Sequence, residues 1–325
     1  MSSILDTRAH YKPFQYPAAF EFYHQQQKMG WLPEEVPLHT DVSDWNNKLT
    51  LPEKNLLTQL FRFFTQGDAD VAQGYFDNYI PVFKLPELRM MMGAFANMES
   101  VHMHAYSLLL DTVGMDEVEY QAFTSFKEMA DKHNYVEQFK IVGEEGSNEY
   151  LESVAKSLAV YSGFTEGLQL FSSFAILMNF QRFNKMKGMC TIVEWSIKDE
   201  SLHIEGMLWL FREFIKQHRW IWTDDFKREI YEIARKMVEL EDHFIDLAFE
   251  MGGIEGLEAE EVKQYIRYIA DRRLLQLGLK ANYGVKYNPL GWLDWIINAE
   301  VHTNFFEKRS TDYAKTGTLT GSLWD

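Results

Sequence analysis

The pattern Glu-x-x-His could bind a metal, and it occurs at Glu99–His102 (ESVH) and at Glu200–His203 (ESLH). On a helix, residues three apart share a face, so the carboxylate and the imidazole of each pair can reach one ion. The chain contains roughly 30 glutamates and ten histidines, which predicts about one match by chance. The pattern also occurs at Glu21–His24, which we interpret as a chance match on a solvated face.

A further carboxylate precedes each of the two remaining motifs at a similar distance. Asp68 lies 31 residues before Glu99, and Glu166 lies 34 residues before Glu200. At about 1.5 Å per residue, each separation fits a helical hairpin that returns the chain to the same depth. The resulting four carboxylates and two histidines form the ligand set of ferritin-like dinuclear bundles. Oxygen ligands with imidazole favour iron or manganese.

Other interpretations of these residues remain open at this point. An acid on a helix is usually solvated, and Asp70 lies close to Asp68. Glu166, however, stands in SGFTEGLQLFSSFAILMNF, where an unpaired buried carboxylate would be costly. Tyr106 follows His102 by four residues and so lies on the same face. Most buried tyrosines are core residues, but beside a metal pair a phenol is also a one-electron donor.

The elements that must position these residues are predicted to be long helices. Seven of the eight prolines lie at or before Pro86, and the eighth is Pro289. Because proline costs about 3 kcal/mol inside a helix, this gap favours uninterrupted helices. We predict an all-α, ferritin-like helical bundle formed by one domain over residues 1–307, followed by a polar, flexible tail over 308–325. The predicted helices cover residues 17–28, 52–79, 86–113, 116–131, 147–179, 184–217, 223–251, 259–277 and 290–298.

Composition excludes several classes of protein. The single cysteine excludes an internal disulfide and clusters built on several thiolates, and indicates a cytoplasmic protein. The net charge of −16, with no basic run, argues against binding to nucleic acid. The N-terminus does not have the pattern of a signal peptide, and no apolar stretch of about 18 residues predicts a membrane span.

Taken together, these motifs resemble the small, radical-generating subunit of class I ribonucleotide reductase. The resemblance extends over almost the whole chain. It rests on the motifs already described and on several further stretches, namely ESVHMHAY, DESLH, YKPFQYP, WLPEEVPL, LTLPEKNLLTQLFRFF and FEKRSTDY.

The resemblance implies a homodimer with two iron ions per chain, although manganese or a mixed manganese/iron pair also fits. The metal pair would activate oxygen and oxidise Tyr106 to a stable radical. This radical would pass to a large catalytic subunit, where it starts the reduction of ribonucleotides to deoxyribonucleotides. The residues that match the family's metal ligands are Asp68, Glu99, His102, Glu166, Glu200 and His203.

The resemblance also implies a path for radical transfer through Trp31, Asp199 and the tail residue Tyr313. The carboxylate of Asp199 could accept the outer N–H of His102 and the indole N–H of Trp31. The tail, with Trp324 near its end, would bind the large subunit. Without the resemblance, Trp31 would be a packed core indole, Asp199 a helix-surface acid and Tyr313 an ordinary exposed tyrosine.

Two other functions are compatible with the same ligands. A ferritin-like protein could bind and oxidise iron without passing a radical on, and it would not need the tail. A di-iron oxidase would act on an apolar ligand, and it would need a tunnel that reaches the metals.

Overall fold

The computed structural model describes residues 3–122 and 125–294, and of Thr65 only the backbone. This part of the chain is helical and contains no β-strand, which confirms the prediction of an all-α fold. The α-helices are α1 (Pro17–Met29), α2 (His39–Asn47), α3 (Leu51–Gly74), α4 (Pro86–Val113), α5 (Val118–Ala122), α6 (Lys127–Val136), α7 (Asn148–Val160), α8 (Phe171–Arg182), α9 (Lys187–Gln217), α10 (Asp224–Ala248) and α11 (Ala259–Gln276). Two π-helices, η2 (Tyr75–Tyr79) and η5 (Tyr161–Leu170), and short 3-10 turns, η1 (Pro33–Glu35), η4 (Glu137–Phe139) and η6 (Arg219–Ile221), complete the elements.

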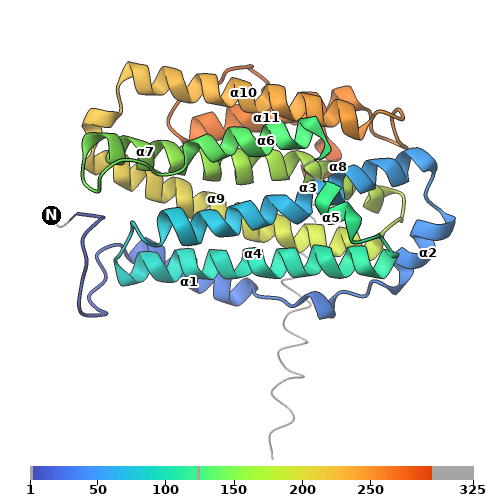
Figure 1. The fold of residues 1–325 in the computed structure, drawn as a ribbon, viewed down its shortest axis with the longest axis horizontal. Coiled ribbons are helices and arrows are strands. Elements are labelled where there is room, and N and C mark those ends of the chain that lie inside the picture. Colours follow the sequence, from blue (N-terminus) through green and yellow to red (C-terminus); the bar gives the residue numbers. More distant parts are fainter. Residues whose placement is uncertain (1–2, 123–124, 295–325) are drawn as a thin grey trace, which may run out of the picture.

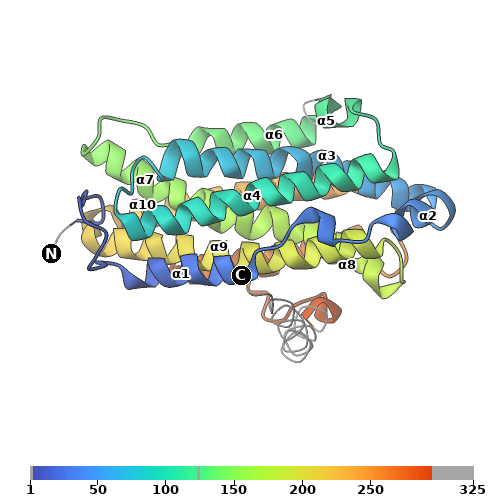
Figure 2. The same cartoon turned by 90° about the horizontal axis from the view of Figure 1, so that it is seen from below.

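The long helices run roughly along the longest axis of the molecule (Figure 1). Helices α10 and α11 lie at the top of this view, and α4 and α1 lie at the bottom. Helix α4 packs against α3, α1 and α9, and the view from below shows α1 and α9 on one side of α4 and α3 on the other (Figure 2). Helices α3, α4 and α9 and the π-helix η5 contact one another within the bundle.

Local sequence signals explain where several helices begin and end. Thr50 and Glu53 form a reciprocal capping box at the start of α3, which satisfies backbone N–H groups that have no partner within the helix. Ser147 caps α7 by accepting a hydrogen bond from the backbone N–H of Tyr150. Helix α4 has the bounds predicted from the sequence, and it ends at Gly114, whose φ of 78° suits glycine.

The start of α9 is capped by another helix instead of by its own sequence. Met186, just before α9, has a φ of 52°, and its side chain provides no cap. The buried carboxylate of Asp41 on α2 accepts hydrogen bonds from the backbone N–H groups of Gly188 and Met189, both at 2.8 Å. Asp44 accepts one from Met186 at 2.9 Å. Helix α2, which the sequence analysis did not predict, therefore fixes the position of α9.

The helix predicted over residues 147–179 contains the ten-residue π-helix η5. Wider π-helical turns are rare and are often found at functional sites. At Gly167, a Cβ atom would lie 2.7 Å from Nε of Arg273 and 3.0 Å from the Ser162 carbonyl oxygen, so any other residue would force its neighbours to shift. The Arg273 side chain donates a hydrogen bond from Nε to the Gly167 carbonyl, at 2.7 Å. This contact from α11 satisfies a carbonyl of the irregular segment.

The prediction of one helix over residues 116–131 is wrong. The structure has two short helices, α5 and α6, and the backbone at Phe126 between them is extended. The guanidinium carbon of Arg62, on α3, lies over the Phe126 ring, 4.7 Å from the ring centre. This contact with α3 accompanies the break, which helical periodicity alone does not reveal.

A buried ion pair joins α6 to α10. Lys132 Nζ lies 2.6 Å from Glu241 Oε2, and both side chains are almost completely excluded from solvent. The ammonium group also lies 3.5 Å from the centre of the Phe63 ring and 4.2 Å from that of Phe244. Ser172 donates a hydrogen bond to the other carboxylate oxygen of Glu241. The carboxylate is therefore paired on both sides.

Part of what the sequence predicts lies beyond the described residues. The element predicted over 290–298 is covered only to residue 294, and the tail predicted over 308–325 falls outside altogether. Among the described helices, none is long and apolar enough to cross a membrane.

Candidate metal centre

The six residues predicted as metal ligands are all buried in the middle of the bundle. Their side chains are at most 2% exposed. They come from four elements, with Asp68 on α3, Glu99 and His102 on α4, Glu166 on η5, and Glu200 and His203 on α9. By contrast, both members of the Glu21–His24 motif are exposed on α1.

Four of these residues form a tight cluster of potential ligand atoms. Glu99, Glu166, Glu200 and His203 each offer one atom, and these atoms all lie within 4.8 Å of one another. His102 adjoins this cluster, because its Nδ1 atom lies 3.2 Å from Glu200 Oε1 and 3.4 Å from Glu99 Oε2.

Asp68 lies outside the tight cluster but shares its electrostatic environment. Burial raises the pKa of Asp68 well above its ordinary value, while the charge of His102 acts to lower it. The charges of Glu99 and Glu200 raise the same pKa further.

The cluster contains many buried atoms that lack a hydrogen-bond partner in the described structure. Both carboxylate oxygens of Glu99 and Glu200 are in this state, as are Oδ2 of Asp68 and Oε2 of Glu166. His203 Nδ1 lies 2.8 Å from Glu99 Oε1, but this contact lacks hydrogen-bond geometry. Buried oxygens without partners are costly, and a cation at their centre would satisfy them. The donor set of carboxylates and imidazoles therefore fits a pair of iron or manganese ions.

Without a cation, protons must balance the negative charge. Burial raises the pKa of Glu166 well above its ordinary value. For His203, burial lowers the pKa, but the contacts with Glu200 and Glu99 outweigh burial and raise it to about 10. The pKa of His102 is likewise raised, because Asp199, Glu200 and Glu99 outweigh burial. Metal binding would therefore displace protons from the site.

A hydrogen-bond network holds the outer sides of both histidines. His102 Nε2 lies 3.1 Å from Asp199 Oδ2, and His203 Nε2 lies 3.1 Å from Gln26 Oε1. The Gln26 amide in turn donates to Asp199 Oδ1 at 2.7 Å, and the Trp31 indole donates to Asp199 Oδ2 at 2.8 Å. Once the Nδ1 protons are displaced, the ring proton that remains on Nε2 of each histidine would leave Nδ1 with a lone pair for a metal ion.

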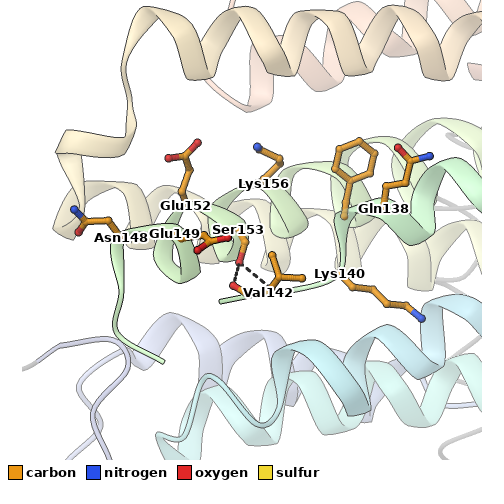
Figure 3. Close-up of a pocket in the computed structure, with 9 residues that line it drawn as sticks. Gln138, Lys140, Val142, Asn148, Glu149, Glu152, Ser153 and Lys156 are labelled. Carbon is orange, nitrogen blue, oxygen red and sulfur yellow. Dashed lines mark hydrogen bonds between the residues drawn. The ribbon is translucent and has the colours of Figure 1, made fainter. Parts of the chain in front are cut away.

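The network reaches the molecular surface beside Trp31. The Trp31 ring stacks near His102, with ring centres 5.9 Å apart, and meets the Trp195 ring edge-on at 5.2 Å. A hollow of about 250 Å³ opens here and is lined by Trp31, Trp195, Asp199 and Lys198, among others. Another hollow, of about 460 Å³, lies over α7 and includes Glu152 (Figure 3), but no candidate ligand lines it.

Tyr106 lies beside the cluster in an apolar environment. It is 1% exposed, and its ring stacks on Phe64 with centres 4.8 Å apart. Burial raises the pKa of Tyr106 well above its ordinary value, and the charge of Asp68 adds to this effect. Ser196 is close enough to lower this pKa, although neither hydroxyl meets hydrogen-bond geometry.

Three residues that contact the site were not predicted from the sequence. Trp195 precedes Asp199 by four residues, and Tyr75 follows Asp68 by seven, so helical periodicity could have placed both on the relevant faces. Tyr75 donates a hydrogen bond to Glu166 Oε1 at 3.0 Å. Gln26 carries no such signal, because it reaches the site through the packing of α1 on α4 and α9. Two predicted residues of the tail, Tyr313 and Trp324, lie outside the described residues.

Comparison with known proteins places this arrangement in a family. The sequence model of the ribonucleotide reductase small chain matches residues 8–289. The chain belongs to the ribonucleotide reductase small-chain family. A probable ribonucleoside-diphosphate reductase small subunit of Invertebrate iridescent virus 6 is 45% identical, over 97% of this chain and 96% of the viral one.

Solved structures agree with this assignment at the level of the fold. The ribonucleotide reductase R2 subunit from Clostridium botulinum superposes with a TM-score of 0.77 at 22% identity, over 86% of this chain and 88% of that one. A dimanganese(II) NrdF from Streptococcus sanguinis gives a TM-score of 0.69 at 20% identity, over 86% and 94% of the two chains.

Membership of the ribonucleotide reductase small-chain family confirms the predicted function. The chain is the small subunit of a class I ribonucleoside-diphosphate reductase, and membership of this family implies a homodimer that works with a separate large subunit. The family carries a dinuclear metal-carboxylate centre, and the small subunit supplies the radical that starts ribonucleotide reduction.

Proposed function

We propose that the buried cluster is the radical-generating metal centre of this small subunit. The ligands would be Asp68, Glu99, His102, Glu166, Glu200 and His203, and they would hold two iron ions per chain. The observation that carries this proposal is the set of buried carboxylate oxygens that have no hydrogen-bond partner in the described structure. A manganese pair or a mixed pair would satisfy the same oxygens, and metal loading distinguishes these cases.

Tyr106 is the residue that would carry the radical. When bound, the metal pair supplies the oxidising equivalent that removes one electron from this phenol. The chain contributes the surroundings, since the ring is buried and stacked on Phe64, which keeps water and small reductants away. The phenol makes no hydrogen bond to another described residue.

The hydrogen-bond network around Asp199 offers the path by which the radical would leave the site. His102, Asp199 and Trp31 are joined by contacts of 3.1 and 2.8 Å, and Trp31 reaches the hollow that it shares with Trp195. We place Tyr313 as the next redox residue and residues 308–325, which contain Trp324, as the segment that docks on the large subunit. The single cysteine supports a cytoplasmic location.

Substituting the phenol tests the radical assignment. The metal-free chain is loaded with ferrous iron, exposed to oxygen and studied by electron paramagnetic resonance and metal analysis. Tyr106→Phe should keep two irons per chain and lose the tyrosyl signal. Tyr265→Phe is the matched control, because Tyr265 is also buried but lies on α11 beside Arg273, Arg272 and Tyr268. An unchanged tyrosyl signal in Tyr106→Phe would refute the assignment.

A truncation tests the tail. Removing residues 308–325 should leave the radical intact and abolish binding to the large subunit. Unchanged affinity for the large subunit would refute the docking role, whatever the state of the metal centre.

A further inference from the structure

Tyr75 touches the metal centre from a side that the radical path does not use. It begins the π-helical turn η2, directly after α3, and its side chain is 1% exposed. Its hydroxyl donates a hydrogen bond to Oε1 of Glu166, at 3.0 Å. This bond joins the end of α3 to the π-helix η5, so two irregular helical segments meet at one carboxylate.

The bond makes Glu166 different from the other two glutamates of the cluster. Oε1 of Glu166 is occupied by Tyr75, and only Oε2 lacks a hydrogen-bond partner in the described structure. In Glu99 and Glu200, both oxygens lack one. One oxygen of Glu166 is therefore held by Tyr75 and the other is left without a partner, so the orientation of this carboxylate depends on the Tyr75 hydroxyl.

The ring of Tyr75 acts on the same side of the cluster. It meets the imidazole of His203 edge-on, with ring centres 6.4 Å apart and planes at 78°. Phe95 packs beside both rings, since its ring centre lies 4.4 Å from that of His203 and 6.2 Å from that of Tyr75. His102, in contrast, stacks near Trp31. Tyr75 thus contacts the Glu166 and His203 side and leaves the His102 side to the Asp199 network.

We propose that Tyr75 is a positioning residue for one of the two metal positions. Its hydroxyl fixes the rotamer of Glu166, and its ring supports His203, so it sets the affinity of the ion held by these two ligands. The inference rests on the proposed metal centre. Groups that orient metal ligands typically contribute 10- to 100-fold to metal affinity.

Manganese binding tests this directly. Metal-free full-length chain is titrated with Mn²⁺ alone, and binding is followed by calorimetry and by electron paramagnetic resonance. Tyr75→Phe should weaken the binding of one of the two Mn²⁺ ions by about 10- to 100-fold and leave the affinity for the other unchanged. At concentrations where the original chain holds a coupled pair, the variant should show the six-line signal of a single bound Mn²⁺.

The neighbouring tyrosine provides a matched control. Tyr79 belongs to the same π-helical turn, is buried, and contacts the Tyr75 ring at 5.9 Å. Its hydroxyl bonds to the Ser157 carbonyl instead of to a ligand. Tyr79→Phe should therefore keep both affinities and the coupled spectrum. Replacing Tyr75 with 4-aminophenylalanine keeps a donor on the ring and should restore the second ion.

The outcomes separate this inference from the proposed centre. Two ions of unchanged affinity in Tyr75→Phe would overturn the positioning role while leaving the centre intact. Equal loss of affinity for both ions would overturn the positioning role as well. So would a failure of 4-aminophenylalanine to restore binding of the second ion. Fewer than two Mn²⁺ ions in the original chain would instead refute the dinuclear centre.

Discussion

Lys132 and Glu241 form a buried ion pair, and replacing each residue separately should make the free energy of unfolding depend on pH in opposite directions. In Lys132→Met, the carboxylate of Glu241 loses its cation at 2.6 Å and stays in a buried site. In Glu241→Gln, the ammonium of Lys132 is left between two aromatic rings without a counter-charge. Breaking a buried pair by removing one partner costs about 3 to 5 kcal/mol of unfolding free energy.

The direction of each pH dependence follows from burial. Burial raises the pKa of Glu241 and lowers that of Lys132, and in each case the partner's charge opposes burial. Without Lys132, the folded pKa of Glu241 lies further above its unfolded value of about 4.3, so stability is lost as pH rises. Without Glu241, the folded pKa of Lys132 lies further below about 10.4, so stability is lost as pH falls. Each slope approaches about 1.4 kcal/mol per pH unit between the folded and unfolded pKa values.

Urea unfolding between pH 5.5 and 9 measures both slopes. The loss of unfolding free energy relative to the original chain should grow as pH rises for Lys132→Met. For Glu241→Gln, this loss should shrink as pH rises. The double variant removes both charges, so its difference should be smaller than that of either single variant and nearly independent of pH. Parallel slopes in the two single variants would show that the pair does not control their stability.

Further predictions concern the residues that hold the metal ligands. Gln26→Leu removes the bonds to His203 and Asp199 and should lower metal affinity about 10- to 100-fold, measured by manganese titration against the exposed control Gln25→Leu. Unchanged affinity would exclude a role for the amide. Gly167→Ala places a methyl group 2.7 Å from Nε of Arg273 and should cost about 1 to 3 kcal/mol in urea unfolding. A fully stable Gly167→Ala chain would show that the π-helix relaxes without loss.

Much of the fold could be predicted because the helices carry their own signals. Pro86 and Gly114 delimit α4, and the long interval without proline covers most of the helical core. The candidate ligands could be found because carboxylates and histidines repeat at helical spacing. The wider turns of η5 could not be predicted, because the contact that supports them comes from Arg273 on another helix. Helix α2 could not be predicted for a similar reason, since Asp41 has a structural role only when α9 packs against it.

The position of Gln26 shows the same limit at the site itself. Three glutamines follow one another on α1, and the sequence does not distinguish the buried one from its exposed neighbours. Only the packing of α1 on α4 and α9 brings this amide between His203 and Asp199.

The hydrogen-bond network around Asp199 also has a thermodynamic consequence. It runs without interruption from His203 through Gln26 and Asp199 to Trp31, whose ring lines a hollow at the surface. A molecule that binds in this hollow with different affinities for the metal-loaded and metal-free chains must change metal affinity by the same factor, because the coupling free energy is reciprocal. Such a molecule would sense the loading state of the centre at the surface, through the carboxylate of Asp199 that both sides share.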